Sequence, residues 1–271
     1  MESFSLSDED FNLFQKCIYE KCGITFSDLN RATLESRIWK SLQSEKVESP
    51  KDFYKKIMSD NESMGHFLDL ITTNLTSFFR SPLQLDAVTR TVLPLLINQK
   101  RGEKSKNIRI WSAGCSTGEE PYTLAMIFEK NLPLDLTYTV IASDLSLKSL
   151  ETGNAGIYPA KKIADIPQPY SKFVEPVGDD KYKICDSIRK KVTFDYHNLL
   201  HSSKFSSFDL VFCRNVLIYF DAASQMEVLD NIFEALSPNG YLFLGHSESI
   251  IGMDSRFNFL HDRNVCYYKK K

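Results

Sequence analysis

Apolar residues recur at spacings of three and four along residues 1–75, and this spacing predicts helices. Ser7, with acidic residues directly behind it, is a typical helix start, and Gly23 is a typical helix end. Ser27 and Pro50 begin further periodic segments with residues that helix starts favour. We therefore expect residues 1–75 to form an all-helical N-terminal domain.

The pattern changes after residue 76, where short continuous apolar runs alternate with helical segments. Such runs are typical of strands that are buried on both faces of a sheet. Their alternation with helices predicts a doubly wound parallel sheet, and two last runs around a polar turn predict a terminal hairpin. The expected fold class is α/β, with a Rossmann-like domain over residues 76–271 whose buried strands lie at 108–111, 138–144, 208–213 and 241–245.

Residues 160–191 do not follow this alternation, because short apolar stretches lie among charges with a turn at Gly178-Asp179-Asp180. We expect a small antiparallel β-subdomain here, at about 168–192, inserted between units of the main sheet. Such an insertion can bind a partner or can be a structural elaboration, and the pattern leaves both interpretations open. Its predicted strands lie at 171–176, 181–185 and 188–195.

The chain has 271 residues, of which 42% are hydrophobic and 25% are charged, as in ordinary globular proteins. Its net charge of -2 creates no field that attracts nucleic acid, and its apolar runs are too short for insertion into a membrane. The N-terminus is acidic and has no signal-peptide core. Six cysteines without Cys-x-x-Cys spacing indicate neither zinc nor disulfides, so we expect a cytoplasmic protein without a metal site.

The most informative stretch is residues 107–126, where a predicted strand leads through a turn of small residues into a helix. Small residues let backbone N–H groups approach a ligand closely, as in nucleotide-binding domains. No complete phosphate-binding glycine motif is present, and Glu119 and Glu120 would repel a pyrophosphate. A cationic ligand fits better, and S-adenosylmethionine carries an ammonium and a sulfonium. An ordinary turn with two surface acids is the competing interpretation.

Polar residues also follow the predicted strands. Asp144 ends the second strand, where folds of this class bind ribose hydroxyls, although an Asp there is also a common helix cap. Arg214 and Asn215 end a later strand at the edge where such sheets bind ligands. Before the first predicted strand, Arg80 follows Phe78 and Phe79, which suit a hydrophobic core. Packing in a core does not explain an arginine at this position.

Six segments, which follow one another in the same order along the chain, resemble the CheR-type methyltransferases, which esterify glutamates of bacterial chemoreceptors. The resemblance covers nearly the whole chain. It implies a class I S-adenosylmethionine-dependent methyltransferase domain, preceded by an all-α domain that docks the substrate, with S-adenosylhomocysteine as product. The segments are NLTSFFR (74–80), WSAGCSTGEEPYTLAM (111–126), ASDLS (142–146), GIYP (156–159), FDLVFCRNVLIYFD (208–221) and GYLFLGHSES (240–249).

By position, the resemblance also implies roles for individual residues. Arg80 and Tyr219 are the expected catalytic residues. One residue of the acidic pair meets the cofactor ammonium, and we favour Glu119 over Glu120. Asp144 is implied at the ribose. The other implied cofactor contacts are Asn74, Thr76 and Arg80 near the methionine end, Gly114 in the turn, Asn198 and Leu199 beside the adenine, and Arg214 and Asn215 at the active-site floor.

The implied reaction suits these residue types. A substrate glutamate has a pKa of about 4.3 and is already a carboxylate at neutral pH, so methyl transfer needs no general base. The enzyme must instead align the carboxylate oxygen, the methyl carbon and the sulfur. We expect Arg80 to hold the carboxylate through two hydrogen bonds and Tyr219 to add a hydrogen bond or to shape the methyl channel. A buried hydrogen-bonding role is the structural alternative for both.

Arg31, Arg37 and Lys40 share one predicted helix face, and the resemblance implies that this face docks on the cytoplasmic helical bundle of a chemoreceptor. A solvated helix face is the plainer interpretation. Asn30 and Ser41 stand where relatives are often basic, which suggests altered docking. The inserted sheet lacks the Gly-x-Gly turn of members that tether to a receptor's C-terminal peptide, which disfavours a tether. We expect a monomer with possible partner contact through the inserted sheet.

Two other functions remain open from the sequence. A catalytically silent chain can keep the cofactor fold as a docking scaffold in a signalling complex, but intact Arg80, Glu119, Asp144 and Tyr219 argue against it. A methyltransferase for small molecules or nucleic acid is the third alternative, and the weak net charge disfavours nucleic acid.

Overall fold

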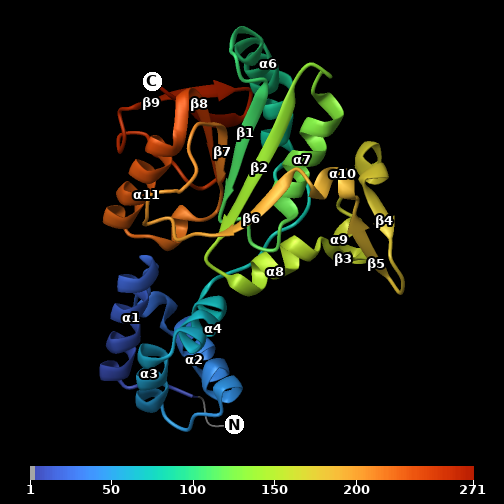
Figure 1. Ribbon diagram of the computed structural model, residues 1–271. Coiled ribbons are helices and arrows are strands. Elements are labelled where there is room, and N and C mark those ends of the chain that lie inside the picture. Colours follow the sequence, from blue (N-terminus) through green and yellow to red (C-terminus); the bar gives the residue numbers. More distant parts are fainter. Residues whose placement is uncertain (1–3) are drawn as a thin grey trace.

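The computed structural model describes residues 4–271, and Figure 1 shows a helical domain beside a larger α/β domain. Ser7 caps the first helix by accepting a hydrogen bond from the Asp10 backbone N–H, and Gly23 ends it with a φ of 70°. The helical prediction for this part is confirmed, while residues 1–3 of its range lie outside the described residues. The helices are α1 (Asp8–Cys22), η1 (Asp28–Asn30), α2 (Arg31–Glu45), α3 (Pro50–Ser59) and α4 (Asn61–Ile71).

The helical domain has a hydrophobic core of its own, which is centred on aromatic rings. The ring centroid of Phe14 lies 5.9 Å from that of Phe53 and 5.7 Å from that of Phe67. All three side chains are buried, in a cluster to which α1, α2, α3 and α4 all contribute. Aromatic pairs at these separations add to the stability that burial supplies. The apolar residues whose spacing predicts these helices are thus the residues that pack the helices together.

The larger domain is built on a seven-stranded sheet in the order β6-β2-β1-β7-β8-β10-β9. The first five strands are parallel, and β10 is antiparallel to both β8 and β9. The predicted doubly wound sheet with a terminal hairpin is therefore confirmed. Its strands are β1 (Asn107–Ala113), β2 (Thr137–Asp144), β6 (Val192–Tyr196), β7 (Phe208–Cys213), β8 (Leu236–Leu244), β9 (Phe257–Asp262) and β10 (Val265–Lys270).

Helices cover both faces of this sheet (Figure 1). Successive side chains of a strand point to opposite faces, so in β1 Ile110 joins the core under α6 and α7, whereas Trp111 joins the core under α11. Both faces of the sheet are consequently buried, which explains the continuous apolar runs. The helices are α5 (Pro82–Ala87), the π-helical turn η2 (Val88–Val92), α6 (Leu93–Gly102), α7 (Glu119–Asn131), α8 (Leu147–Ala155) and α11 (Ala222–Ala235).

A small antiparallel sheet stands beside the main one, in the order β3-β5-β4 (Figure 1). Its strands are β3 (Ile157–Pro159), β4 (Val174–Pro176) and β5 (Lys181–Ile184). The turn between β4 and β5 contains Gly178, whose φ is 109°, and no atom lies within 4 Å of a Cβ built there. This turn is thus an open tip. Three short helices complete the subdomain, namely α9 (Ala160–Ile163), η3 (Gln168–Phe173) and α10 (Asp186–Arg189).

The predicted strands of this subdomain are wrong in two places. The predicted strand 171–176 is half helix, because η3 extends to Phe173. The predicted strand 188–195 is divided between α10 and β6, and β6 pairs with β2 in the main sheet. The third strand of the small sheet is β3, which precedes the predicted limits of 168–192. A strand of three residues is too short to show a hydrophobic period, so only its pairing with β5 reveals it.

The loop after α1 joins the two domains. Ile24 forms an isolated antiparallel bridge with Phe220, and the Thr25 N–H donates to the carbonyl of Tyr219 at 2.9 Å. The Asn198 side chain donates to the Lys21 carbonyl at 2.8 Å. The segments that make these bonds with the helical domain follow β7 and β6, at the carboxyl ends of the parallel strands. The helical domain is therefore bonded directly to the edge where such sheets bind ligands.

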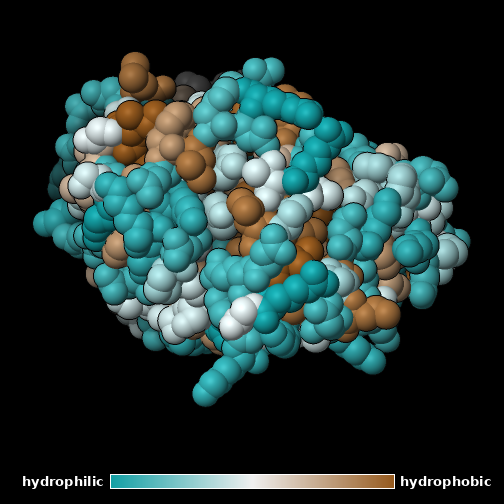
Figure 2. Space-filling model, turned by 90° about the horizontal axis from the view of Figure 1, so that it is seen from above, coloured by the Kyte–Doolittle hydropathy of each residue, from teal (hydrophilic) through white to brown (hydrophobic). Residues whose placement is uncertain are grey.

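Figure 2 views the molecule from the end that carries α6 and β9 in Figure 1, and this face is mainly hydrophilic with smaller groups of apolar side chains. Within the part of the chain that the structure describes, no helix is both long and apolar enough to cross a membrane.

A buried ion pair connects α6 to β7 and supports a prediction about stability. Lys100 Nζ lies 2.8 Å from Asp209 Oδ1, and both side chains are almost completely buried. Replacing Asp209 with Ala leaves the Lys100 ammonium with Glu103 as its remaining partner at 2.9 Å and leaves the Arg109 N–H without its acceptor, so the free energy of unfolding should fall by about 1–3 kcal/mol. Urea denaturation measures this loss.

The matched control is Asp135→Ala, which removes an exposed pair with Arg101. Exposed pairs contribute little because water screens them, so this variant should unfold like the wild type. Equal stability of both variants would show that the buried pair has no special role.

Candidate functional site

A cavity of about 520 Å³ lies between the two domains, at the carboxyl ends of the parallel strands. Its volume falls in the range of ligand sites, roughly 300–1,000 Å³. The helical domain, the segment that joins the domains and the loops of the sheet all contribute to its wall. The lining residues are Cys22, 24–26, Asn30, Thr33, Arg37, 71–76, Arg80, 114–116, Glu120, 144–145, 197–199, 214–216 and 218–220.

The turn after β1 brings the backbone to the cavity. Gly114 has a φ of 77°, and a Cβ there would lie only 2.5 Å from Val216 Cγ2. Its N–H donates to the Ser143 carbonyl at 2.8 Å, which fixes the turn to the end of β2. Only glycine satisfies both the positive φ and the close approach. The predicted small-residue turn is thus a wall of the cavity.

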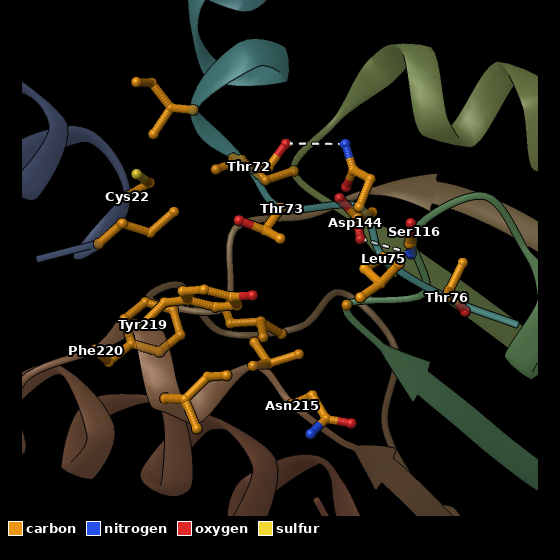
Figure 3. A pocket seen from close by; sticks show the side chains of 18 of the residues that line it. Cys22, Thr72, Thr73, Leu75, Thr76, Ser116, Asp144, Asn215, Tyr219 and Phe220 are labelled. Atoms are coloured by element: carbon orange, nitrogen blue, oxygen red, sulfur yellow. Dashed lines mark hydrogen bonds between the residues drawn. The ribbon is translucent and has the colours of Figure 1, made fainter. Parts of the chain in front are cut away.

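Asp144 ends β2 and lies at the same wall (Figure 3). Its Oδ2 accepts the Ser116 N–H at 2.8 Å, and its Oδ1 accepts the Ser146 N–H at 2.9 Å. The carboxyl is held in one orientation by both bonds. Burial raises the pKa of Asp144, and the backbone N–H groups oppose that rise only in part.

The two adjacent acids at the start of α7 point in different directions. Glu119 is buried, forms an ion pair with Lys162 and accepts a hydrogen bond from Thr117, and it does not line the cavity. Glu120 lines the cavity and accepts a hydrogen bond from Ser112 Oγ at 2.7 Å. The preference for Glu119 at the cofactor ammonium therefore disagrees with this placement. Consecutive helical residues point about 100° apart, and the sequence does not reveal which of the two faces the site.

Arg214 lies at the floor of the cavity with its guanidinium already engaged. Its Nε donates to Glu120 Oε2 at 2.7 Å, and its Nη1 donates to the Arg80 carbonyl at 3.0 Å and to Gln84 Oε1 at 2.9 Å. Its side chain is only 3% exposed. Arg214 is thus placed to organise the floor of the cavity. The sequence analysis missed its partner Gln84, because Gln84 lies on α5 and belongs to no motif.

The loop after β7 depends on a second residue that the sequence analysis did not single out. Glu248 accepts the Asn215 N–H at 2.7 Å and the Ile218 N–H at 3.3 Å. Asn215 has a φ of 59°, a conformation that non-glycine residues rarely adopt. Glu248 therefore holds a strained loop in place, and this loop also carries Tyr219 into the cavity wall (Figure 3).

Arg80 reaches the cavity from a strained turn. Its neighbours Phe79 and Ser81 have φ values of 51° and 61°. Phe78 is buried in the core, and the Phe79 N–H donates to Thr123 Oγ1 at 3.1 Å. These anchors fix the turn, while Arg80 itself is only partly buried and donates one bond to the Leu75 carbonyl at 3.1 Å. The guanidinium keeps donors that can meet a ligand.

The remaining predicted contacts also reach the cavity wall. Asn74 and Thr76 line it, and Asn74 donates to Thr72 Oγ1 at 3.2 Å (Figure 3). Asn198 and Leu199 line it as well, although the Asn198 amide is bonded to the helical domain. The structure thus brings together every predicted cofactor residue except Glu119.

The three basic residues predicted to share a docking face have different surroundings. Arg31 forms ion pairs with Asp8 and Glu35. Arg37 turns toward the cavity and donates to the Ile71 carbonyl and to Thr73. Lys40 is exposed.

The docking role predicted for Arg31, Arg37 and Lys40 therefore remains a prediction, which these contacts do not test. Arg31 is neutralised within its own domain, and Arg37 supports the segment that enters the site. The helical period places residues on a face, but the partners of long side chains come from other segments of the fold.

Three further lining residues come from the loops after α1, β1 and β6. Thr25 Oγ1, Ser116 Oγ and His197 Nε2 are buried and have no hydrogen-bond partner within residues 4–271. Burial also lowers the pKa of His197, which favours the neutral ring. Unpartnered polar atoms are unusual in protein interiors, and their presence at one cavity suggests a ligand site.

The donor set of the cavity fits S-adenosylmethionine. Glu120 offers an anion for an ammonium, Asp144 offers an acceptor for hydroxyls, and Arg80 offers donors for a carboxylate. No group of three or more metal-binding side chains occurs in the described part of the chain.

Two family matches cover nearly the whole chain. Residues 9–72 match the CheR methyltransferase, all-alpha domain, and residues 74–266 match the CheR methyltransferase, SAM binding domain.

Individual relatives agree with these matches. The chain is 32% identical over 278 residues to chemotaxis protein methyltransferase 2 of Vibrio cholerae, and the aligned region covers 99% of this chain and 96% of the relative. It is 33% identical over 262 residues to a chemotaxis protein methyltransferase of Borreliella burgdorferi, with 92% and 91% covered. It is 33% identical over 276 residues to chemotaxis protein methyltransferase 1 of Pseudomonas aeruginosa, with 98% and 100% covered. The chain therefore belongs to the CheR methyltransferase family and is an S-adenosylmethionine-dependent methyltransferase.

Proposed function

We propose that this enzyme methylates glutamate side chains of chemoreceptor cytoplasmic domains and forms the methyl esters used in sensory adaptation. The observation that carries the proposal is one cavity, closed by both domains, that joins acidic side chains with a partly free arginine. Acids suit the cationic groups of the cofactor, and the arginine suits a carboxylate substrate. The names of the relatives, all chemotaxis protein methyltransferases, support the same substrate class.

The cofactor, when bound, supplies an electrophilic methyl group on its sulfonium. We place its ammonium at Glu120, its ribose hydroxyls at Asp144 and its adenine beside Asn198 and Leu199. The methionine end then lies toward the segment that joins the domains. The residues assigned to that end are Asn74, Thr76, Arg80, Gly114 and Asn215, while Arg214 holds Glu120 in position.

The catalytic contribution of the chain is positioning. Arg80 holds the substrate carboxylate in the fixed direction that its strained turn imposes, and Tyr219 lines the same cavity. The carboxylate is already ionised, so no residue has to remove a proton. Correct alignment of the reacting atoms can supply several kcal/mol, roughly 7–11 in the best cases. Binding that strengthens only in the transition state is what accelerates the reaction.

The partner we propose is the acidic helical bundle of a chemoreceptor, met by a single copy of this chain in the cytoplasm. Lys40 is the exposed cation on α2 that remains for this contact. The open tip between β4 and β5 is exposed and is the part of the small sheet that we assign to a partner contact.

The direct test is calorimetric titration of the purified protein with S-adenosylmethionine and S-adenosylhomocysteine, followed by transfer of tritiated methyl groups to receptor-containing membranes of the source cell. We expect micromolar binding and base-labile label on receptor glutamates. A folded protein that binds neither compound would instead favour the scaffold function.

Replacing Arg80 with Ala should lower kcat for methyl transfer about 100-fold, because the carboxylate loses its alignment. The dissociation constant for S-adenosylhomocysteine, measured by calorimetry, should change by no more than about threefold. The control Arg80→Lys keeps the charge but not the two-bond geometry, and it should regain only part of the rate. Equal losses in binding and transfer would contradict a catalytic role.

Replacing Glu120 with Gln should weaken S-adenosylhomocysteine binding about tenfold, because the ammonium loses its counter-charge. Glu119→Gln is the matched control, since it alters the neighbouring acid that pairs with Lys162, and it should change the affinity less than about twofold. Thermal melting confirms that both variants are folded. The reverse ranking would move the ammonium to Glu119.

Cofactor affinity should depend on pH through Asp144. Burial raises its pKa, so the carboxyl takes up a proton at a higher pH than an ordinary Asp. Ribose hydroxyls donate to the charged form, so affinity is complete above this raised pKa and falls as the pH drops through it. Asp144→Asn should bind more weakly, by about tenfold, and without this pH dependence. A variant with unchanged affinity would exclude Asp144 from the ribose site.

A further inference from the structure

One threonine hydroxyl on α7 contacts the strained turn that carries Arg80. The side chain is that of Thr123, a residue that is only 2% exposed. Its Oγ1 accepts the Phe79 N–H at 3.1 Å and donates to the Glu119 carbonyl at 2.7 Å. The hydroxyl therefore acts as donor and acceptor at once. Thr123 connects the first turn of α7 to the residue that precedes Arg80.

The helix itself does not need this hydroxyl. A helical main chain already bonds each carbonyl to the N–H four positions later, so the bond from the Thr123 side chain to the Glu119 carbonyl is an additional one. β-branched residues also favour helices less than unbranched residues do. A valine would fill the same buried space, but it could not accept the Phe79 N–H. Acceptance of this N–H is thus the contact that explains a hydroxyl at this position.

The main chain around Arg80 is held from both sides. Phe79 has a φ of 51°, in the left-handed region that non-glycine residues rarely adopt. Such a conformation persists only where the surroundings determine it. The Phe79 N–H is bonded to Thr123, and the Arg80 carbonyl accepts Arg214 Nη1 at 3.0 Å. The two bonds come from α7 and from the end of β7, and together they fix the direction in which the Arg80 side chain leaves the turn.

Packing of the neighbouring aromatic rings does not replace the hydrogen bond. The ring centroid of Phe78 lies 5.0 Å from that of Tyr158, and the ring centroid of Phe79 lies 4.7 Å from that of Tyr170. Each ring is joined to the main chain through rotatable bonds, so these contacts bury the rings without fixing the peptide plane. A hydrogen bond instead requires the N–H to point at its acceptor. Loss of the hydroxyl would leave the rings packed and the peptide before Arg80 free to turn.

We propose that Thr123 is a positioning residue for methyl transfer, which orients Arg80 through the Phe79 N–H. The proposal rests on the proposed function, because that function assigns the substrate carboxylate to Arg80. Thr123 does not line the cavity, so it acts through the turn and not on the ligands. A displacement of about 1 Å in a reacting group can lower a rate about 100-fold, so the loss of one orienting bond should be measurable in kcat.

The test uses the purified full chain, S-adenosylmethionine and receptor-containing membranes of the source cell. Thr123→Val keeps the shape of the side chain and removes the hydroxyl, and it should lower kcat about tenfold. The dissociation constant for S-adenosylhomocysteine should change less than about twofold. Thr123→Ser keeps the hydroxyl and loses a methyl group, so it should retain most of the wild-type kcat. A role in packing predicts the opposite ranking, because only the serine variant leaves a cavity.

The matched control is Thr89→Val. The Thr89 hydroxyl donates to the Leu85 carbonyl at 2.8 Å, which is the same kind of bond to a carbonyl four positions earlier, and it accepts no hydrogen bond from any residue in 4–271. This variant should keep the wild-type kcat. Thermal melting shows whether each variant is folded. If Thr123→Val does not fold, Thr123→Ala removes the same hydroxyl and takes its place in every comparison.

A second arm tests whether Thr123 acts through Arg80. In an Arg80→Ala background, Thr123→Val should cause no further loss of kcat, because the side chain that it orients is absent. The same substitution in the wild-type background should cause the full tenfold loss, about 1.4 kcal/mol of transition-state stabilisation.

Several outcomes would overturn the proposal. A wild-type kcat in Thr123→Val, or an equal loss in Thr123→Ser, refutes the orienting bond. A loss that persists in the Arg80→Ala background shows that Thr123 acts elsewhere, and a parallel weakening of S-adenosylhomocysteine binding assigns it to the cofactor site. All of these results leave the proposed function intact. A wild-type enzyme that binds the cofactor but labels no receptor glutamate refutes that function itself.

Discussion

The site depends on one buried charge. The guanidinium of Arg214 bonds to Glu120 on α7, to the Arg80 carbonyl before α5 and to the Gln84 side chain on α5. A buried charge is costly unless it is paired and its hydrogen bonds are satisfied, so all three partners must arrive together. One side chain at the end of β7 consequently sets the relative positions of the acid that faces the cavity and the turn that carries Arg80.

Two carboxylates of the site, Asp144 and Glu248, likewise fix neighbouring segments, by accepting hydrogen bonds from backbone N–H groups. Asp144 receives N–H groups from two loops, and Glu248 receives N–H groups from the strained loop that holds Asn215. Each carboxylate thus satisfies backbone donors that burial would otherwise leave without partners. The strain at Asn215 and beside Arg80 persists because these anchors determine the loop conformation. Preorganisation of this kind is what a reaction without proton transfer requires of its enzyme.

The helical domain helps to close the cavity that the loops of the sheet form. Thr25 and Arg37 belong to the helical domain and line the same cavity as the turns of the sheet. The N–H of Thr25 is bonded to the main chain of Tyr219. The helical domain and the loop that carries Tyr219 are therefore held together at the cavity. Arg37 supports the segment that enters the site through its bonds to the Ile71 carbonyl and to Thr73.

Much of the fold and most of the site could be predicted from the sequence. Helical spacing, buried apolar runs and the terminal hairpin are local patterns, and they determined the helical domain, the order of strand and helix, and the motifs at the ends of the strands. The turn around Gly114 and the acid at Asp144 followed from the same logic, because parallel strands bring their carboxyl ends to one edge. Composition, likewise, indicated a globular protein.

Only the tertiary structure decided which side chains face one another. It separated Glu119 from Glu120, divided the basic residues of α2 among different partners, and placed β6 in the main sheet and β3 in the small one. The physical reason is that hydrophobic periodicity specifies the faces of an element. The partner of a buried charge or of a short edge strand is instead set by segments that lie far away in the chain.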